Sequence, residues 1–228
     1  MVLQRTRATM PRCEVHWHGT VQYARGLAIQ DDLVQRRRAG EIADQLLLLE
    51  HPHVLTLGRD AHRENILADD ERLNALGVEV HEAGRGGDVT YHGPGQLVAY
   101  PILDLAPDRC DLHRYVRDLE RAMLGVLADF GIAGSTVPGK TGVWVDDAKV
   151  GAIGVRVARW ITSHGIAFNV HSDLAFFDLI VPCGLRESAV TSLASLTGRH
   201  DLSVQDVGAR FAAHFGRVFE RDMQETSS

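Results

Sequence analysis

Hydrophobic residues recur every three or four positions in four parts of the chain, a spacing typical of helices with one buried face. The longest of these series predicts a helix over residues 110–130, and Gly131 directly after it is a typical helix stop. Similar spacing predicts helices over 23–38, 69–76 and 203–219. Helices are therefore expected near both ends of the chain and once in its middle.

Alternating or continuous hydrophobic residues predict strands between these helices. Four consecutive leucines at 46–49 are typical of a strand that is buried on both faces. The other expected strands lie at 15–17, 78–82, 88–91, 97–103, 143–145, 150–158 and 161–170. This order of elements predicts an α/β or α+β domain with a mixed sheet and helices packed on it.

The chain has 228 residues, of which 45% are hydrophobic, so it is long enough for one domain with a substantial core. No linker rich in proline, serine or charge interrupts it, and we expect a single domain over 13–222 with flexible ends at 1–12 and 223–228. The first residues lack the apolar core of a secretory signal, and no apolar run is long enough for a membrane span. These features predict a soluble, cytoplasmic protein.

The charged residues narrow the range of partners. A net charge of −6 argues against general nucleic-acid binding. Lys140 and Lys149 are the only lysines among 24 basic residues, so a lysine at either position is unusual for this chain. The arginine run at 36–38 is either a solvated helix end or a docking patch for an acidic partner.

Two sequence motifs resemble ligand-binding sites, but the sequence around each argues against a bound ligand. Residues 134–141 match the spacing of a nucleotide-binding P-loop, but a helix is predicted before them and a strand after them, which is the reverse of what that motif requires. We interpret them as a loop. Cys13, His16 and His18 could form part of a metal site, but no second pair of ligands completes a tetrahedral set.

Residues 85–96 are the stretch most typical of a binding site. They contain four glycines and a proline, and Val89 and Tyr91 alternate with Thr90 and His92, which predicts a short strand between two glycine turns. Such a strand could form a ligand-contacting wall with Arg85 as a fixed cation and His92 as a titratable group. The alternative is a tight hairpin with no ligand.

A second candidate site involves a cysteine. The three cysteines are Cys13, Cys110 and Cys183, and an odd number without a signal sequence predicts reduced thiols. Cys183 lies in a Val-Pro-Cys-Gly bend that could present its thiol, and a nucleophilic thiolate needs a cation nearby. Lys149, on a strand with glycines at 151 and 154, is the candidate cation. The residues alone leave open a buried, inert Cys183 and a solvated Lys149.

The sequence Arg-Gly-Gly-x-x-Thr-Tyr-His-Gly-Pro-Gly-Gln-Leu-Val-x-Tyr at 85–100 resembles the signature of the lipoate-protein ligase B family, the octanoyl-[acyl-carrier-protein]:protein octanoyltransferases. The resemblance extends over 15–219 and includes, in the family's order, residues 46–52, 149–156, 164–170, 181–184 and 190–193. It implies the fold shared by biotin and lipoate protein ligases. It also implies that Cys183 and Lys149 form a catalytic dyad.

The family's activity would be the first step of endogenous protein lipoylation. An octanoyl group would move from octanoyl-acyl carrier protein to Cys183 as a thioester, and then to a lysine of a lipoyl domain. The implied partners are acyl carrier protein, the lipoyl domains of 2-oxoacid dehydrogenase complexes and the glycine cleavage H protein, with neither nucleic acid nor membrane involved. No metal is implied, and no cofactor beyond the phosphopantetheine of the carrier.

The resemblance assigns Lys149 the tuning of the thiol and the acid/base role. His92 and His164 are alternative bases, because a histidine needs no pKa shift to act near neutral pH. The expected substrate-binding residues are Arg85, Gly86, Gly87, Asp88, Val89, Thr90, Tyr91, His92, Ala152, Ile153, Gly154, Gly165, Ile166 and Ala167. Two other functions are kept as alternatives: an ATP-dependent lipoate or biotin protein ligase, and a non-catalytic module that binds an acyl carrier or a lipoyl group.

Overall fold

The computed structural model describes residues 10–107, 109–181 and 189–226. Its main feature is a large mixed sheet. In order across the sheet, the strands are β12 (Asp222–Glu225), β1 (Arg12–Thr20), β2 (Asp44–Glu50), β6 (Gln96–Ile102), β10 (Ile161–Asn169), β9 (Ala148–Ala158), β8 (Lys140–Val145) and β7 (Ser135–Val137). The two-residue strand β11 (Ala189–Val190) pairs with β9.

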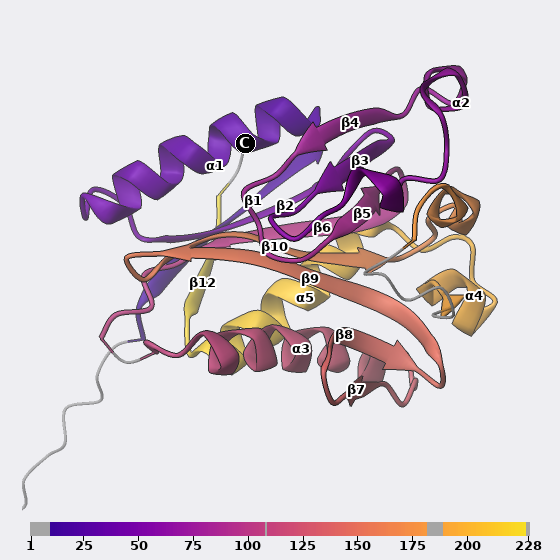
Figure 1. Ribbon diagram of the computed structural model, residues 1–228. Helices are drawn as coiled ribbons and strands as arrows, with labels where there is room; N and C mark the ends of the chain where they lie inside the picture. The colour runs from indigo at the N-terminus through magenta and orange to yellow at the C-terminus, as the bar shows by residue number, and fades with distance from the viewer. Residues whose placement is uncertain (1–9, 108, 182–188, 227–228) are drawn as a thin grey trace, which may run out of the picture.

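A smaller sheet and the helices form layers on the two faces of this sheet. The small sheet consists of β4 (Glu79–Glu82), β3 (Val54–Leu57) and β5 (Val89–His92) in that order. It lies with α1 (Tyr23–Arg38) on one face, and α3 (Leu112–Asp129) and α5 (Val204–Phe219) cover the other face (Figure 1). The shorter helical segments are η1 (Arg63–Asn65), α2 (Asp70–Ala75), η2 (Leu174–Leu179) and α4 (Leu193–Thr197). The predicted mixed sheet with packed helices is confirmed.

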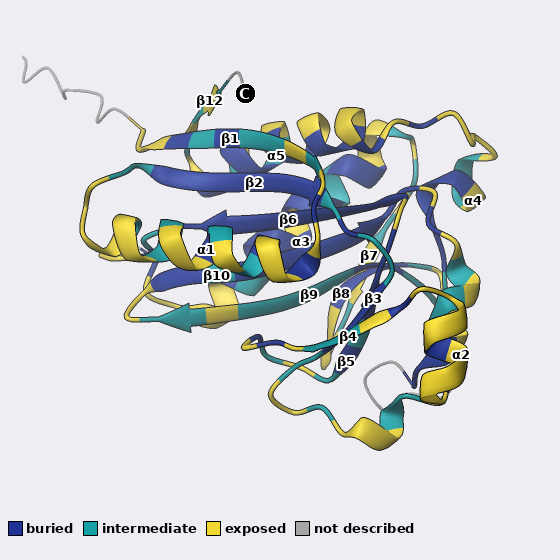
Figure 2. Ribbon diagram, turned by 90° about the horizontal axis from the view of Figure 1, so that it is seen from above, coloured by how far each residue is buried: buried dark blue, intermediate teal, exposed yellow. Residues whose placement is uncertain are grey.

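The hydrophobic cores explain why the central strands read as continuous apolar runs. Leu46 and Leu48 of β2 pack into the core beneath α3 and α5, and Leu47 and Leu49 pack on the opposite face toward α1. Both pairs are at most 3% exposed. Figure 2 shows β2 and β6 dark blue between the layers, whereas β9 is teal along much of its length because it lies near one side of the sheet. β9 is thus the central strand most open to a ligand.

The long helices begin and end at residues that the sequence signals. Asp111 caps α3 by accepting a hydrogen bond from the backbone N–H of Arg114, and Ser203 caps α5 by accepting one from Asp206. Their buried faces meet each other, where Tyr115 packs edge-on against Phe219. These contacts make α3 and α5 one layer.

Some segments differ from the prediction. The P-loop-like stretch forms the hairpin of β7 and β8 with no helix after it, which agrees with our rejection of that motif. Strand β3 was not predicted, and it occupies the centre of the small sheet. Residues 223–225 were assigned to a tail outside the domain, but they belong to β12, which pairs in parallel with β1.

The arginine run at the end of α1 is partly structural. Arg37 donates to the buried carboxylate of Asp44 at 2.7 Å, and Arg221 reaches the same carboxylate at 2.7 Å. Arg36 pairs with Asp32 one turn earlier at 3.3 Å. These contacts anchor the end of α1 and favour the interpretation of a helix end over that of a docking patch. None of the helices that the structure describes is long and apolar enough to cross a membrane.

Candidate functional site

A cavity of about 750 Å³ lies along β9 and β10. The loop from β4 to β5 forms one wall, β9 and β10 form the floor, and α1, the start of α3 and the β7–β8 turn complete it. The predicted substrate-binding residues that line this cavity are Arg85, Gly86, Gly87, Asp88, Val89, Thr90, His92, Ala152, Ile153, Gly154, Gly165, Ile166 and Ala167. Lys149 also lines it. Three stretches distant in sequence are therefore brought together.

Tyr91 is the exception among the predicted binding residues. Its side chain is fully buried in the core between the small sheet and η2, where it stacks on Phe176 at 5.2 Å between ring centroids. Its hydroxyl is 2.8 Å from Nδ1 of His53. Because side chains alternate along a strand, Tyr91 supports the small sheet while its neighbours Thr90 and His92 line the cavity.

Arg85 is buried at the cavity, with 6% of its surface exposed. One guanidinium nitrogen donates to the backbone carbonyl of Thr56 at 2.6 Å and to its hydroxyl at 2.8 Å. Gly58, two residues further on, leaves room for this arrangement, because a Cβ there would collide with the Gly87 carbonyl and lie 2.8 Å from the guanidinium. The unpredicted strand β3 thus holds the fixed cation of the site.

Three buried histidines lie near Arg85. Burial lowers the pKa of His92 to about 3, with the neighbouring His51 as the next cause. Burial lowers the pKa of His51 to about 4, and burial together with the charge of Arg85 lowers the pKa of His164 to about 4. All three imidazoles are therefore neutral near pH 7. Of these, His92 and His164 line the cavity.

Lys149 is half-buried near the start of β9 and lies against an aromatic ring. Its Nζ is 4.8 Å from the ring centroid of Trp144, which is opposite it on β8. Gly142 lies next to it, and a Cβ at that glycine would be 3.5 Å from Cε of Lys149. Lys140 extends over the same Trp144 ring at 5.5 Å and also lines the cavity. The only two lysines of the sequence thus share one site.

Cys183 lies outside the described residues. The chain after it is described from Ala189, and Val190 pairs with Lys149 in the β11–β9 ladder. The backbone N–H of Thr191 then donates to the carbonyl of Lys149 at 2.9 Å. Val190 and Thr191 therefore lie beside Lys149.

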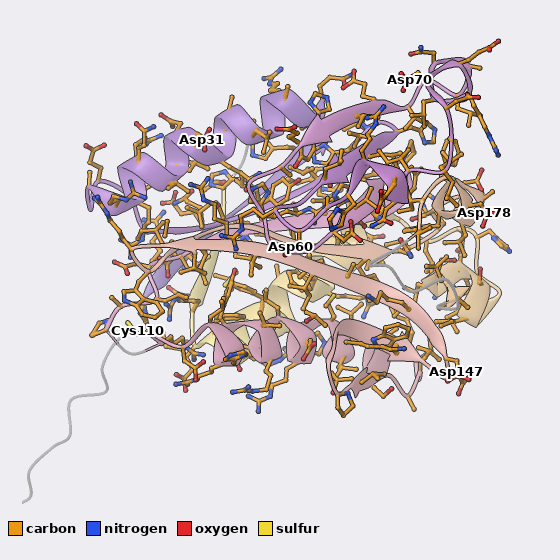
Figure 3. All side chains as sticks on the ribbon, viewed as in Figure 1. Asp31, Asp60, Asp70, Cys110, Asp147 and Asp178 are labelled. Atoms are coloured by element: carbon orange, nitrogen blue, oxygen red, sulfur yellow. The ribbon has the colours of Figure 1, made fainter. Side chains whose placement is uncertain are left out.

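The other two cysteines are not at the cavity. Cys13 is fully buried in the core, and burial raises the pKa of its thiol, with the charge of Asp44 as the next cause. Cys110 is exposed just before α3, and Figure 3 shows it across the molecule from Asp147, which lies two residues before Lys149. Cys13 and its neighbour His16 do not form a ligand cluster, because His16 bonds to Gln45 and Thr226.

Several residues of the cavity wall were not among the predicted binding residues. His164 was expected as an alternative base within a family motif, and Lys140 as an unusual lysine within the rejected P-loop. The others are Tyr23, Arg59, Tyr100, Leu112, Val116, Pro138, Gly139, Thr141 and Val155. Most belong to elements that read as ordinary amphipathic helices or turns, so no local pattern marks them.

Comparison with known families identifies the class of protein to which this fold and this cavity belong. Residues 22–216 match the lipoyl protein ligase A/B catalytic domain, and the chain belongs to this family. A bi-partite lipoate protein ligase solved with its E2 lipoyl domain, from Thermoplasma acidophilum, has a TM-score of 0.72 at 15% identity and covers 97% of this chain and 88% of that one. A biotin protein ligase from Aquifex aeolicus has a TM-score of 0.51 at 12% identity, covering 91% and 69%.

Closer sequence relatives are more specific. The chain is 51% identical over 214 residues to an octanoyltransferase from Solibacter usitatus (strain Ellin6076), covering 94% of this chain and 96% of that protein. The predicted family membership and the predicted ligase-like fold are both confirmed.

Proposed function

We propose that this chain is an acyltransferase that moves an octanoyl group from a carrier-bound thioester to a lysine of a lipoyl domain. The observation that carries the proposal is the 51% identity to an octanoyltransferase over 94% of the chain. Lys149 and all of the predicted substrate-binding residues except Tyr91 line one cavity, which supports the proposal.

The cavity suits an acyl chain joined to a polar head. Leu112, Val116, Ile153, Val155 and Ile166 supply apolar surface, and Arg85 and Lys149 supply charge. Burying an octanoyl chain at ~0.8 kcal/mol per methylene would contribute roughly 5 kcal/mol. That is enough to hold an acyl intermediate while the two partner proteins exchange.

In the first half-reaction, the thiolate of Cys183 attacks the carbonyl carbon of the donor thioester. A new thioester bond to Cys183 forms, the carbon–sulfur bond to the carrier breaks, and the carrier leaves as a thiol after taking up a proton. The ammonium group of Lys149 stabilises the attacking thiolate and supplies that proton. The pairing of Val190 with Lys149 supports this assignment because it brings the chain that follows Cys183 to Lys149.

In the second half-reaction, a lysine amine of the lipoyl domain attacks the acyl-Cys183 thioester. An amide bond forms, the thiolate of Cys183 leaves, and the amine loses a proton. Lys149, neutral after the first step, accepts that proton. Burial lowers the pKa of His92 to about 3 and that of His164 to about 4, so both imidazoles are too weakly basic to serve near pH 7.

The relatives indicate lipoyl domains as the class of acceptor. Within that class we propose the lipoyl domains of 2-oxoacid dehydrogenase complexes and the glycine cleavage H protein, with octanoyl-acyl carrier protein as the donor. The thioester already carries the activation, so the proposed reaction uses neither a nucleotide nor a metal, and no cofactor beyond the carrier's phosphopantetheine. The cytoplasm is the proposed location, because its reducing conditions keep Cys183 as a free thiol.

An activity assay separates this function from its alternatives. The purified chain is incubated with a lipoyl domain and either octanoyl-acyl carrier protein without ATP, or free octanoate with ATP and Mg²⁺. The proposal predicts octanoylated lipoyl domain only with the first donor. Product only with the second donor would make the chain a ligase, and binding of both partners with no product in either arm would make it a non-catalytic module.

A further inference from the structure

A chain of buried hydrogen bonds crosses the structure from the cavity to the backbone beside Lys149. It starts at His92, whose Nδ1 is 2.8 Å from Oε1 of Gln96. Nε2 of Gln96 donates to Oδ1 of Asn169 at 3.0 Å, and Nδ2 of Asn169 donates to the carbonyl of Thr191 at 3.0 Å. All four residues are at least nine-tenths buried. Gln96 and Asn169 belong to sequence motifs for which the proposed chemistry gives no role.

The direction of these bonds follows from the backbone carbonyls that they reach. Thr191 O can only accept, so the amide of Asn169 must present its nitrogen there and its oxygen to Gln96. The nitrogen of Gln96 donates to that oxygen and to the carbonyl of Tyr91 at 3.3 Å. The oxygen of Gln96 therefore faces His92, and the imidazole must donate to it from Nδ1.

The surroundings of His92 keep it in one neutral form. Tyr23 and His51 lie against its ring, with centroids at 6.4 Å and 5.8 Å, and Arg85 and His164 act on it from the β4–β5 loop and from β10. Burial and these neighbours hold the pKa of His92 well below its usual range. With its proton fixed on Nδ1, the imidazole can offer a ligand only the lone pair of Nε2.

We propose that Gln96 and Asn169 are positioning residues that fix His92 as a hydrogen-bond acceptor for the incoming lysine amine. This inference rests on the proposed function. His92 cannot donate to the oxygen of a tetrahedral intermediate, because its proton is committed to Gln96. Its Nε2 instead accepts one N–H of the amine and orients the amine within the cavity. The proton that the amine loses goes to Lys149, so His92 directs the attack without being protonated.

The tautomer can be read directly by NMR of protein labelled with ¹⁵N-histidine, without any assay of transfer. The wild-type chain is expected to show His92 protonated on Nδ1 alone from pH 5 to 8. Gln96→Glu places a carboxylate beside the ring and should make His92 an imidazolium within that range. Asn169→Leu should release Gln96 and give a mixture of tautomers.

A matched control is available far from the cavity. His16 and Gln45 form another histidine–glutamine pair, with His16 Nε2 at 2.8 Å from Gln45 Oε1 and Gln45 buried on β2. Gln45→Glu should alter His16 and leave the His92 signals unchanged. Urea unfolding of Gln45→Glu also measures how much a buried glutamate by itself lowers the free energy of unfolding.

The two half-reactions then test the role in transfer. Acylation by octanoyl-acyl carrier protein should stay within about twofold of wild type in Gln96→Glu, whereas transfer from the isolated acyl-enzyme to a lipoyl domain should slow about tenfold, the loss expected for one hydrogen bond. If Gln96→Glu slowed acylation and transfer equally, and Gln45→Glu slowed both by the same factor, the role of Gln96 would be merely structural and the proposal would be overturned. An Nε2-protonated His92 in the wild-type chain would also overturn it. If the wild-type chain transfers no octanoyl group, the proposed function fails, and the NMR result still shows whether the hydrogen-bond chain sets the tautomer.

Discussion

Lys149 differs chemically from the arginines that form most of the basic residues of this chain, because an ammonium group can lose its proton and a guanidinium group does not. Its side chain lies over Trp144 and beside Gly142, and the proposed mechanism gives it two roles, stabilising the Cys183 thiolate and accepting the proton of the amine. The proposed mechanism requires both roles in sequence. Substitutions at this residue can separate them.

We predict that Lys149→Ala impairs both half-reactions, and that Lys149→Arg does not restore transfer. Arginine supplies the charge that favours a thiolate, so alkylation of Cys183 by iodoacetamide should stay close to wild type, while transfer to the lipoyl domain falls at least about a hundredfold, as expected for loss of a general base. The measurement compares alkylation rate against pH with octanoyl transfer in the same proteins. Wild-type transfer by Lys149→Arg would exclude the base role, and unchanged alkylation in Lys149→Ala would exclude the electrostatic one.

At the residue scale, the sequence predicted the cavity-lining residues best where several of them are close together in the chain. The residues from Arg85 to His92 were predicted from their glycine spacing and from the family motif, and all but Tyr91 line the cavity. Thr56, which holds Arg85, could not be predicted, because the contact joins residues 29 positions apart through an unpredicted strand. The role of Cys183 stays a prediction.

Among the elements, the hairpin of β8 and β9 carries Lys149 and depends on a close approach of two backbones. Gly142 has φ +127°, and a Cβ there would be 2.5 Å from the carbonyl oxygen of Gly151. Its N–H donates to the buried carboxylate of Glu120 on α3 at 3.0 Å. The hairpin is thus tied to the helix layer immediately beside Lys149.

Gly142→Ala should therefore force the two strands apart and displace Lys149. We expect a loss of roughly 1–3 kcal/mol in the free energy of unfolding and a larger relative loss of transfer than that destabilisation explains. Gly131→Ala is the control, because Gly131 also has a positive φ, +71°, but nothing lies within 4 Å of its Cβ position. It should cost about 1 kcal/mol for the backbone conformation alone and keep full transfer at 25 °C. Equal effects of the two substitutions in both assays would refute a specific role for the β8–β9 contact.

The long helices were predicted well, α3 and α5 from a strong periodic pattern and α1 despite a weak one. The predicted helix over 23–38 has the same limits as α1, and α3 and α5 lie within the ranges predicted for them. Strand β3 was missed because it is four residues long and follows His51, Pro52 and His53, which read as the end of the preceding strand. Strand β12 was missed because its polar, largely exposed residues give no hydrophobic signal, and only pairing with β1 defines it.

At the scale of the whole molecule, the buried histidines couple stability to pH. Burial is the first cause that lowers the pKa of His51 and His164 to about 4 and of His92 to about 3, whereas an unfolded histidine has a pKa near 6.5. Between these values the unfolded chain binds protons that the folded chain does not. The contribution of these three histidines to the free energy of unfolding is therefore fully present above pH 6.5 and is lost as the pH falls toward 4.

We predict that the free energy of unfolding is lower at pH 5 than at pH 7 by roughly 2 kcal/mol for each of the three histidines. Urea unfolding at the two pH values measures the difference. His51→Gln should remove one of these contributions, so its loss of stability relative to wild type should be smaller at pH 5 than at pH 7. An unfolding free energy that does not change between pH 7 and 5 would show that these imidazoles have the same pKa in the folded chain as in the unfolded chain.

In the proposed reaction, an octanoyl group passes through a thioester on Cys183. The most direct test of this claim is intact mass spectrometry, followed by peptide mapping, after incubation with octanoyl-acyl carrier protein. We predict one added octanoyl group on Cys183, its loss on addition of a lipoyl domain, no adduct in Cys183→Ser, and normal adducts in Cys13→Ser and Cys110→Ser. An acyl group mapped to Cys13 or Cys110, or full transfer by Cys183→Ser, would contradict the account.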